Sequence, residues 1–204
     1  MIKTAKGVTF TIKDGDYSDK KLVISSPKAT VKNYASFEKI EIRDGNTVYD
    51  RGEGNQIVVK DKNELKLVAG KRAADVNITV ASQSGKIQII NNAKDSTIVT
   101  AADASVVLNQ SANLTVAEGT KLEKLEVKAD ASITVAKGAA IESAVKTDVT
   151  LGANAAISFT EGAEGSMVRS EKAEIKPTVD NKTTDKITVT DAAGKETTID
   201  AGKT

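Results

Sequence analysis

One nine-residue pattern recurs along this chain and constrains its fold more than any other feature. It reads "LTVAEGTKL" at 114–122, "ITVAKGAAI" at 133–141 and "VTLGANAAI" at 149–157. Each copy opens with two apolar residues around a polar one, continues with small or polar residues and ends on an apolar residue. The alternation at period two predicts a strand with one buried face, and the Ala, Gly, Asn and Lys that follow favour a turn.

The pattern extends well beyond these three copies. Further copies are "IVVKDKNEL" at 57–65, "IVTAADASV" at 98–106 and "VVLNQSANL" at 106–114, with looser ones starting at Leu22, Ile40 and Ile78. The apolar anchors recur about every nine residues. Short strands at such spacing also occur in sandwiches and barrels, but those folds vary their strands and loops. One short unit repeated through most of the chain indicates a solenoid, in which each turn packs on its neighbours.

The sequence therefore predicts an all-β, single-chain parallel β-helix. We expect a right-handed, three-sided coil, because a unit of eight or nine residues per side suits that geometry. A two-sided coil stays open, since the first three copies open at Leu114, Ile133 and Val149, and these steps fit two units per turn. Six to nine rungs, stacked at roughly 4.8 Å, would form a rod of roughly 30–45 Å.

Alternation also predicts which side chains face the core of the coil. The expected inward residues are Ile40, Ile42, Ile57, Val59, Leu114, Val116, Ile133, Val135, Val149, Leu151, Ile157 and Phe159. Thr, Lys, Glu and Asp hold the outward positions between them. A helix over 121–131, with Leu122 and Leu125 on one face, is the alternative at one place. Its shortness and the strand patterns on both sides favour a strand there.

The hydrophobic rhythm divides the chain into four parts. We predict an N-terminal cap or first strand at 1–21, the β-helix at 22–168, a polar linker at 169–185 and a C-terminal hairpin at 186–204. The hairpin, with Gly194 in its turn, would be either a cap or the start of a further domain. An uncapped end exposes unpaired strand edges, so end-to-end self-association is a further expectation.

The composition argues against several classes of function. With 29 basic and 28 acidic residues the net charge is +1, so we expect neither nucleic acid nor an anionic membrane as partner. Cys and His are both absent, which removes thiol nucleophiles, the usual zinc ligands and the usual general base. No apolar run approaches the length of a membrane span, so membrane insertion is not expected.

The stretch "GDYSDKKLVISSPKATVKNYASFEKIEIRDGNTVYDRGEGNQIVVKDKNELKLVAG" at 15–70 resembles repetitive segments of large surface proteins of Gram-positive bacteria. The resemblance covers residues 7–168. It implies an extracellular, cell-wall-associated protein with a role in architecture or adhesion, whose partners are cell-wall or host glycans or surface proteins. The N-terminal "MIKTAKGVTF" lacks the apolar segment of a signal peptide, so the resemblance also implies a fragment of a larger secreted protein.

Three carboxylates in one short turn form a candidate calcium site. Asp14, Asp16 and Asp19 surround Gly15, and calcium binds several oxygen ligands at about 2.3–2.6 Å. The spacing is not that of an EF-hand loop, and a solvated turn is the alternative. No other cofactor is expected.

A second charged patch is the only candidate for catalysis. It comprises Glu41, Arg43, Asp44, Asp50, Arg51 and Glu53. Paired carboxylates hydrolyse glycosidic bonds, and a carboxylate with a basic residue can cleave acidic polysaccharides. The short turns leave little room for a cleft, however, and alternating charges on a strand are typical of a solvated face. We therefore expect a protein that is not an enzyme.

Tyr17, Tyr34 and Tyr49 recur at nearly equal intervals. In a two-sided coil they would align as a stripe for sugar rings, whereas in a three-sided coil they would scatter. Partial burial at turns is the preferred interpretation. Separately, Asn91 and Asn92 could start a structural ladder of amides inside a turn.

These observations favour a non-enzymatic structural or interaction module, a stiff β-helical stalk or adhesin segment of a bacterial surface protein. A carbohydrate-binding module, assisted by calcium, is the second hypothesis. A polysaccharide lyase or hydrolase is the third.

Overall fold

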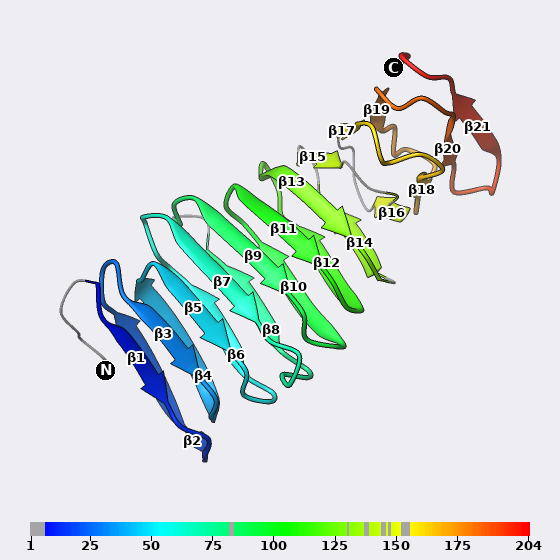
Figure 1. The fold of residues 1–204 in the computed structure, drawn as a ribbon. Helices are drawn as coiled ribbons and strands as arrows, with labels where there is room; N and C mark the ends of the chain where they lie inside the picture. The colour runs from blue at the N-terminus through cyan, green and yellow to red at the C-terminus, as the bar shows by residue number, and fades with distance from the viewer. Residues whose placement is uncertain are drawn as a thin grey trace.

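The computed structural model describes residues 7–81, 84–129, 131–136, 139–143, 146, 148–151 and 156–204. This part of the chain is all-β and forms a parallel β-solenoid (Figure 1). Its strands lie in two sheets, and from β1 to β20 the chain passes from one sheet to the other after each strand. The ribbon is elongated, with the two ends of the chain at its opposite ends (Figure 1).

The odd-numbered strands up to β19 form the first sheet. They are β1 (Thr9–Ile12), β3 (Thr30–Asn33), β5 (Thr47–Asp50), β7 (Leu65–Ala69), β9 (Ile87–Asn91), β11 (Ala104–Leu108), β13 (Lys121–Val127), β15 (Ala140–Ser143), β17 (Ala156–Phe159) and β19 (Thr178–Asn181). Neighbours in this sheet pair in parallel, so each strand lies one coil above the previous one.

The even-numbered strands form the second sheet, which β21 extends. They are β2 (Asp16–Ser25), β4 (Ser36–Asp44), β6 (Gln56–Val59), β8 (Asn77–Val80), β10 (Ser96–Thr100), β12 (Ala112–Val116), β14 (Ala131–Val135), β16 (Asp148–Leu151), β18 (Met167–Ser170), β20 (Ile187–Thr190) and β21 (Glu196–Ile199). Only β20 and β21 pair antiparallel among the strands described here.

The strands form two sheets, so the expected three-sided coil is not confirmed. Leu114, which opens one copy of the repeat, pairs in register with Ile133, which opens the next. Thr134 pairs in the same way with Thr150, the second residue of the third copy. Each nine-residue unit is half of a coil, so two units complete one turn. The predicted parallel β-helix itself is confirmed, whereas its handedness stays a prediction.

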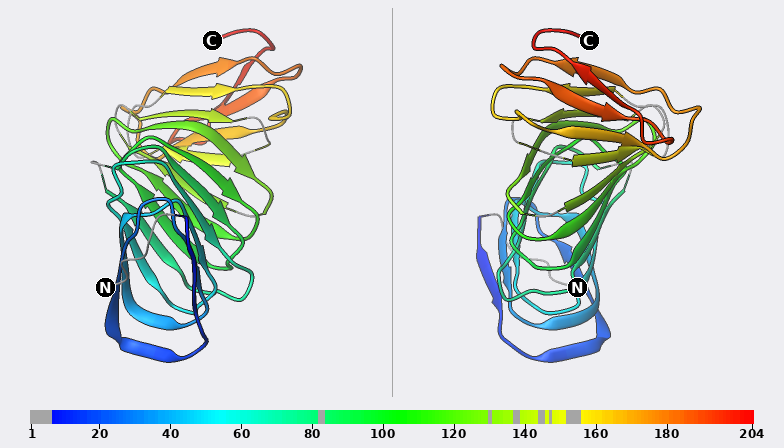
Figure 2. Two further views of the ribbon diagram at one scale, coloured as in Figure 1. Left: turned by 60° about the vertical axis from the view of Figure 1, so that its left-hand side comes forward. Right: turned by 90° about the vertical axis from the view of Figure 1, so that its right-hand side faces the viewer.

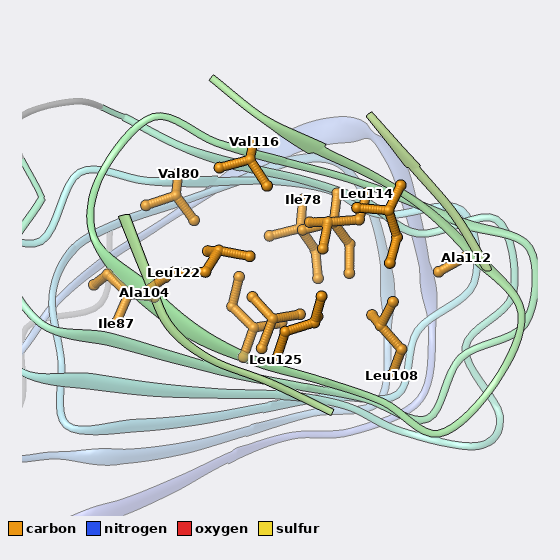
Figure 3. Close-up of a cluster of buried hydrophobic side chains, with 14 of the residues drawn as sticks. Ile78, Val80, Ile87, Ala104, Leu108, Ala112, Leu114, Val116, Leu122 and Leu125 are labelled. Carbon is orange, nitrogen blue, oxygen red and sulfur yellow. The ribbon is translucent and has the colours of Figure 1, made fainter. Parts of the chain in front are cut away.

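The core is a narrow layer of aliphatic side chains between the two sheets. Figure 3 shows Ile78, Leu114 and Val116 from one sheet meeting Leu122 and Leu125 from the other. All these side chains are buried. The predicted inward residues are confirmed as buried wherever the structure describes their side chains, which leaves out Val135. Ile, Val and Leu fill most of this thin space, and Phe159 is the one aromatic residue among the buried core residues described, so the low aromatic content suits this fold.

Polar side chains satisfy the backbone where the chain turns between sheets. Asn33, Asn91 and Asn181 each end a strand and each accepts, through Oδ1, a hydrogen bond from the backbone N–H two residues later. Asn and Asp favour such turns because their short side chains bond to the local backbone. The predicted amide ladder is limited: Asn109 Nδ2 donates to Asn92 Oδ1 at 2.9 Å.

The two ends of the coil differ from the expected domain limits. Residues 169–185, expected as a linker, include β19, which pairs in register with β17. Because this segment is mostly polar, its sequence did not indicate a strand. Val179, the inward apolar residue of β19, is buried. The segment 121–131 is a strand at β13. At the N-terminal end, β1 and the first half of β2 already belong to the first coil, and the views in Figure 2 show them at one end of the stack.

The C-terminal hairpin is confirmed as β20 and β21, with Gly194 in its turn at a φ of 81°. No helix in the described part of the chain has the length and apolar character needed to cross a membrane.

Candidate functional site

The three aspartates of the candidate calcium site do not converge on one point. Asp16 Oδ1 accepts a hydrogen bond from the Ser18 N–H at 2.9 Å, which lowers the pKa of the Asp16 carboxyl. Asp19 pairs with Lys20 at 2.5 Å, and this hydrogen bond lowers the pKa of Asp19. Among the residues whose placement is described, no group of three acidic side chains is arranged to hold a metal ion. The calcium prediction gains no geometric support.

The charged patch at 41–53 is divided between different surroundings. Glu41 lies on β4 and is covered by Arg43 of the same strand, by Lys21 of β2 and by Lys60, which follows β6. Their nitrogens lie 2.9, 2.5 and 3.7 Å from its carboxylate oxygens. The hydrogen bond from Lys21, followed by that from Arg43, lowers the pKa of Glu41 to about 2. A carboxylate held in this way is ionised at neutral pH and cannot act as a general acid.

Asp50 lies at the end of β5 with its side chain buried in a corner of the coil. Asn33 Nδ2 and Asn55 Nδ2 donate to Asp50 Oδ1 at 2.7 and 2.9 Å. Oδ2 has no hydrogen-bond partner in the structure. Burial raises the pKa of Asp50 to about 6, although the two amide hydrogen bonds oppose this rise. This corner stabilises the turn between the sheets and has no access for a substrate.

Two further members of the patch, Asp44 and Arg51, contact residues outside it. Asp44 Oδ1 accepts a hydrogen bond from Asn63 Nδ2 at 3.4 Å, and Arg51 contacts Tyr34. Glu41 forms ion pairs with cations, and Asp50 accepts hydrogen bonds from the two amides of its corner. The two carboxylates therefore form no acid–base pair with each other. These two carboxylates therefore give the lyase or hydrolase hypothesis no support, and that hypothesis stays a prediction.

The buried carboxyl of Asp50, one oxygen of which has no hydrogen-bond partner, makes the free energy of unfolding depend on pH. The folded state keeps a proton on Asp50 that the unfolded chain releases above its ordinary pKa of 3.8, so stability falls as pH rises from there to about 6. We expect Asp50→Asn to be more stable than the parent by about 2–3 kcal/mol near neutral pH and equal to it at about pH 4.

Urea unfolding followed by circular dichroism at both pH values measures this difference. Asp44→Asn is the matched control, because Asp44 lies on the surface side of the same region. A stability loss between pH 4 and 6 that persists unchanged in Asp50→Asn would show that another group causes it.

The residue combination that sequence reasoning missed lies on the first sheet near its N-terminal end. Tyr34 and Tyr49 line a hollow of about 360 Å³ together with Lys32 and Arg51. The Arg51 guanidinium lies 5.2 Å from the centre of the Tyr34 ring, and its Nη1 donates to the Tyr34 hydroxyl at 3.2 Å. Neither Arg51 nor Lys32 forms an ion pair within the described part of the chain, so both keep their positive charge available.

The nearly equal spacing of the tyrosines could have predicted this hollow, but only for a two-sided coil. Lys32 and Tyr49 pair in register on β3 and β5, which places their outward side chains side by side. Tyr17 does not join them and stacks on Phe37, with the ring centres 5.3 Å apart. The stripe that a two-sided coil would give is thus reduced to Tyr34 and Tyr49, and both are half-buried, as the preferred interpretation expected.

The outward face of the same sheet carries a second, longer hollow. It has a volume of about 430 Å³ and crosses several rungs, with Glu64, Lys66, Lys86, Asp103 and Glu123 among its lining residues. Its charged lining residues are of both signs, three acidic and two basic, so no strong charge of one sign gathers there. It forms part of a flat, polar face along the rod.

Comparison of the chain with protein-family models, curated proteins and solved structures found no significant match.

Proposed function

We propose that this chain is a non-enzymatic structural and interaction module, a stiff segment of a bacterial cell-surface protein. The observation that carries the proposal is the pair of continuous parallel sheets, in which each rung packs on the next through a narrow buried core. Nine strand spacings in the first sheet give a length of about 43 Å. Such a stack resists bending because ladders of parallel strand pairing join each rung to the next.

The outer faces suit a rod in an aqueous, crowded environment. The outward residues Lys66, Gln88 and Ser105, which are in register on β7, β9 and β11, keep this face of the first sheet polar. A flat face with few deep hollows fits a spacer, or a surface that contacts an extended partner, better than it fits an enzyme. The sequence resemblance to Gram-positive surface proteins supports the cell-surface location.

Antibodies against the purified chain test the location. We expect them to label intact cells of the organism that encodes it. Labelling that requires permeabilised cells would contradict a cell-surface module. A cytoplasmic protein and a known wall protein of the same organism serve as controls for cell integrity and antibody access.

Carbohydrate binding is the second candidate, and the hollow at Tyr34 favours it. Tyrosine rings stack on sugar faces, while Lys32 and Arg51 would attract the carboxylate or phosphate of an acidic glycan. The ligand class is therefore an anionic polysaccharide, recognised at one place near the N-terminal end of the rod.

An array of bacterial and host polysaccharides tests this candidate. If it is correct, acidic glycans capture the chain, Arg51→Gln loses the capture, and Lys94→Gln, a distant exposed cation, retains it. Capture that depends on calcium would instead return attention to Asp14, Asp16 and Asp19. Shortened products would revive the lyase or hydrolase hypothesis, and silence throughout would leave the structural module alone.

A further inference from the structure

The two ends of the solenoid differ in how their outermost strands are covered. At the C-terminal end, β21 folds back antiparallel on β20 and covers the last strand of the second sheet. The first sheet is covered as well, because the Asn181 N–H donates to the Lys203 carbonyl at 2.8 Å and the Gly202 N–H to the Asn181 carbonyl at 2.7 Å. This end therefore presents few free backbone groups of β19 and β20.

At the N-terminal end, no strand of the described residues lies beyond β1 and β2. Among the described residues, the large apolar side chains that are exposed are Val8, Phe10 and Tyr17, and all three lie in this coil. Phe10 pairs in register with the fully buried Val31, so it occupies an inward position and is 37% exposed because no described rung lies beyond it. An apolar core cross-section is thus left open to solvent.

The edge of β1 lacks the features that usually prevent strand pairing. Edge strands are commonly blocked by charges, by proline or by bulges. The stretch Val8–Ile12 reads "VTFTI" and contains none of these residues. The edge of β2 differs, because its register shifts between Tyr17 and Lys21 and its sequence there is charged. Within the described part of the chain β1 pairs with β3 alone, so the other edge of β1 is the side of this end that can accept a further strand.

The backbone direction of β1 shows which groups are available. The carbonyls of Val8 and Ile12 accept hydrogen bonds from β3 and the residue after it, at 3.0 and 3.1 Å. Since alternate residues of a strand point their backbone groups to opposite sides, Thr9 and Thr11 point theirs to the free edge. These two residues provide two donors and two acceptors for a partner strand.

We propose that two copies of this chain associate head to head, through antiparallel pairing of β1 with β1 of the second copy. When the pairing is centred on Phe10, Thr9 lies opposite Thr11 of the second copy and both exchange backbone hydrogen bonds. The same register places Phe10 against Phe10 and Val8 against Ile12. Every exposed apolar residue of β1 then meets an apolar residue, and the cores of the two coils become continuous.

The charged residues of β2 also fit pairing with a second copy of this chain. In β2 the acidic Asp16 and Asp19 precede the basic Lys20 and Lys21. A two-fold axis reverses one copy relative to the other, which brings the acidic part of each β2 toward the basic part of the other. A closed dimer of this kind uses one surface on both subunits and leaves the capped ends outermost. It doubles the length of the rod.

Sedimentation equilibrium of the intact chain, with two variants at one position, tests the dimer. We expect a monomer–dimer equilibrium in the parent chain and its loss in Thr11→Pro. Proline removes an N–H that only the second copy would use, and edge strands tolerate it. Thr11→Val is the matched control, since it keeps the N–H and should still dimerise.

A cysteine substitution tests the register, because the natural chain has no Cys. Opposed residues that do not exchange hydrogen bonds in an antiparallel pair have Cα atoms about 4.5 Å apart, within disulfide range. Oxidation should therefore link Phe10→Cys into a dimer and leave Thr197→Cys, on β21 at the capped end, largely unlinked. A parent chain that stays monomeric, a Thr11→Pro variant that still dimerises, or assemblies larger than two would each overturn the proposal.

Discussion

Ile133→Asp is expected to unfold the middle of the solenoid, whereas Thr134→Asp, one residue later, is expected to be tolerated. Ile133 is 1% exposed and pairs with Leu114 inside the narrow core. A carboxylate there has no partner, and we expect a loss of at least about 4 kcal/mol in the free energy of unfolding. Thr134 lies on the outer side of the same strand, where a change to Asp should cost about 1 kcal/mol or less.

Urea unfolding followed by far-ultraviolet circular dichroism measures both variants, since the chain has no Trp to report by fluorescence. Because rungs are stabilised mainly by their neighbours, a break at β14 should also weaken the coils on either side. Equal losses in the two variants would mean that the strand register is wrong. Equal tolerance would mean that this part of the chain has no buried core.

Gly52→Ala is expected to cost about 3 kcal/mol, because a methyl group at this corner has no space. A Cβ on Gly52 would lie 2.0 Å from the Ala35 carbonyl oxygen and 2.5 Å from Asn55 Nδ2. The backbone of one coil passes directly over that of the previous coil here. Relief would therefore require moving the corner that also holds the buried carboxyl of Asp50.

Gly45→Ala is the matched control, because the nearest atom to its added Cβ is Leu65 Cδ1 at 3.5 Å. We expect it to change the free energy of unfolding by about 1 kcal/mol or less. Thermal unfolding of the two variants under the same conditions gives the comparison. Similar stability of Gly52→Ala and the parent would show that adjacent coils do not approach each other as closely as described at this corner.

The repeat predicted the solenoid because a short, period-two strand pattern depends only on local alternation. Leu114 and Ile133 are buried, as that alternation requires. The number of sides was less accessible, since units of similar length alternate between two sheets or cycle through three without changing their local pattern. The offset between these two anchors did carry the answer, because it is the length of one full coil.

Other features depended on contacts that a linear pattern does not reveal. The outward position of Glu41 predicted a solvated carboxylate, but cations from adjacent rungs cover it. Asp50 and Arg51 are neighbours in sequence, yet one side chain enters the corner and the other packs on Tyr34. The strand β19 was missed because a single buried apolar residue, Val179, anchors it among polar neighbours.

One row of residues in register runs along the second sheet, and distances along this row measure how the rungs are stacked. Its members in register are Val23, Glu41, Val58, Thr79, Val99, Thr115, Thr134, Thr150, Arg169 and Thr190. Five strand spacings separate Thr79 from Arg169, and eight separate Val23 from Arg169. At about 4.8 Å for each spacing, the expected distances are about 24 Å and about 38 Å.

Pulsed electron spin resonance between spin labels on cysteines introduced at these positions is the most direct test of the stacked two-sheet coil. The labelled chain is diluted with unlabelled chain so that only distances within one molecule contribute. The predicted result is a distance that grows in proportion to the number of rungs, from about 24 Å for the first pair to about 38 Å for the second. Two similar distances, or a shorter one for the pair with more rungs between them, would contradict the solenoid.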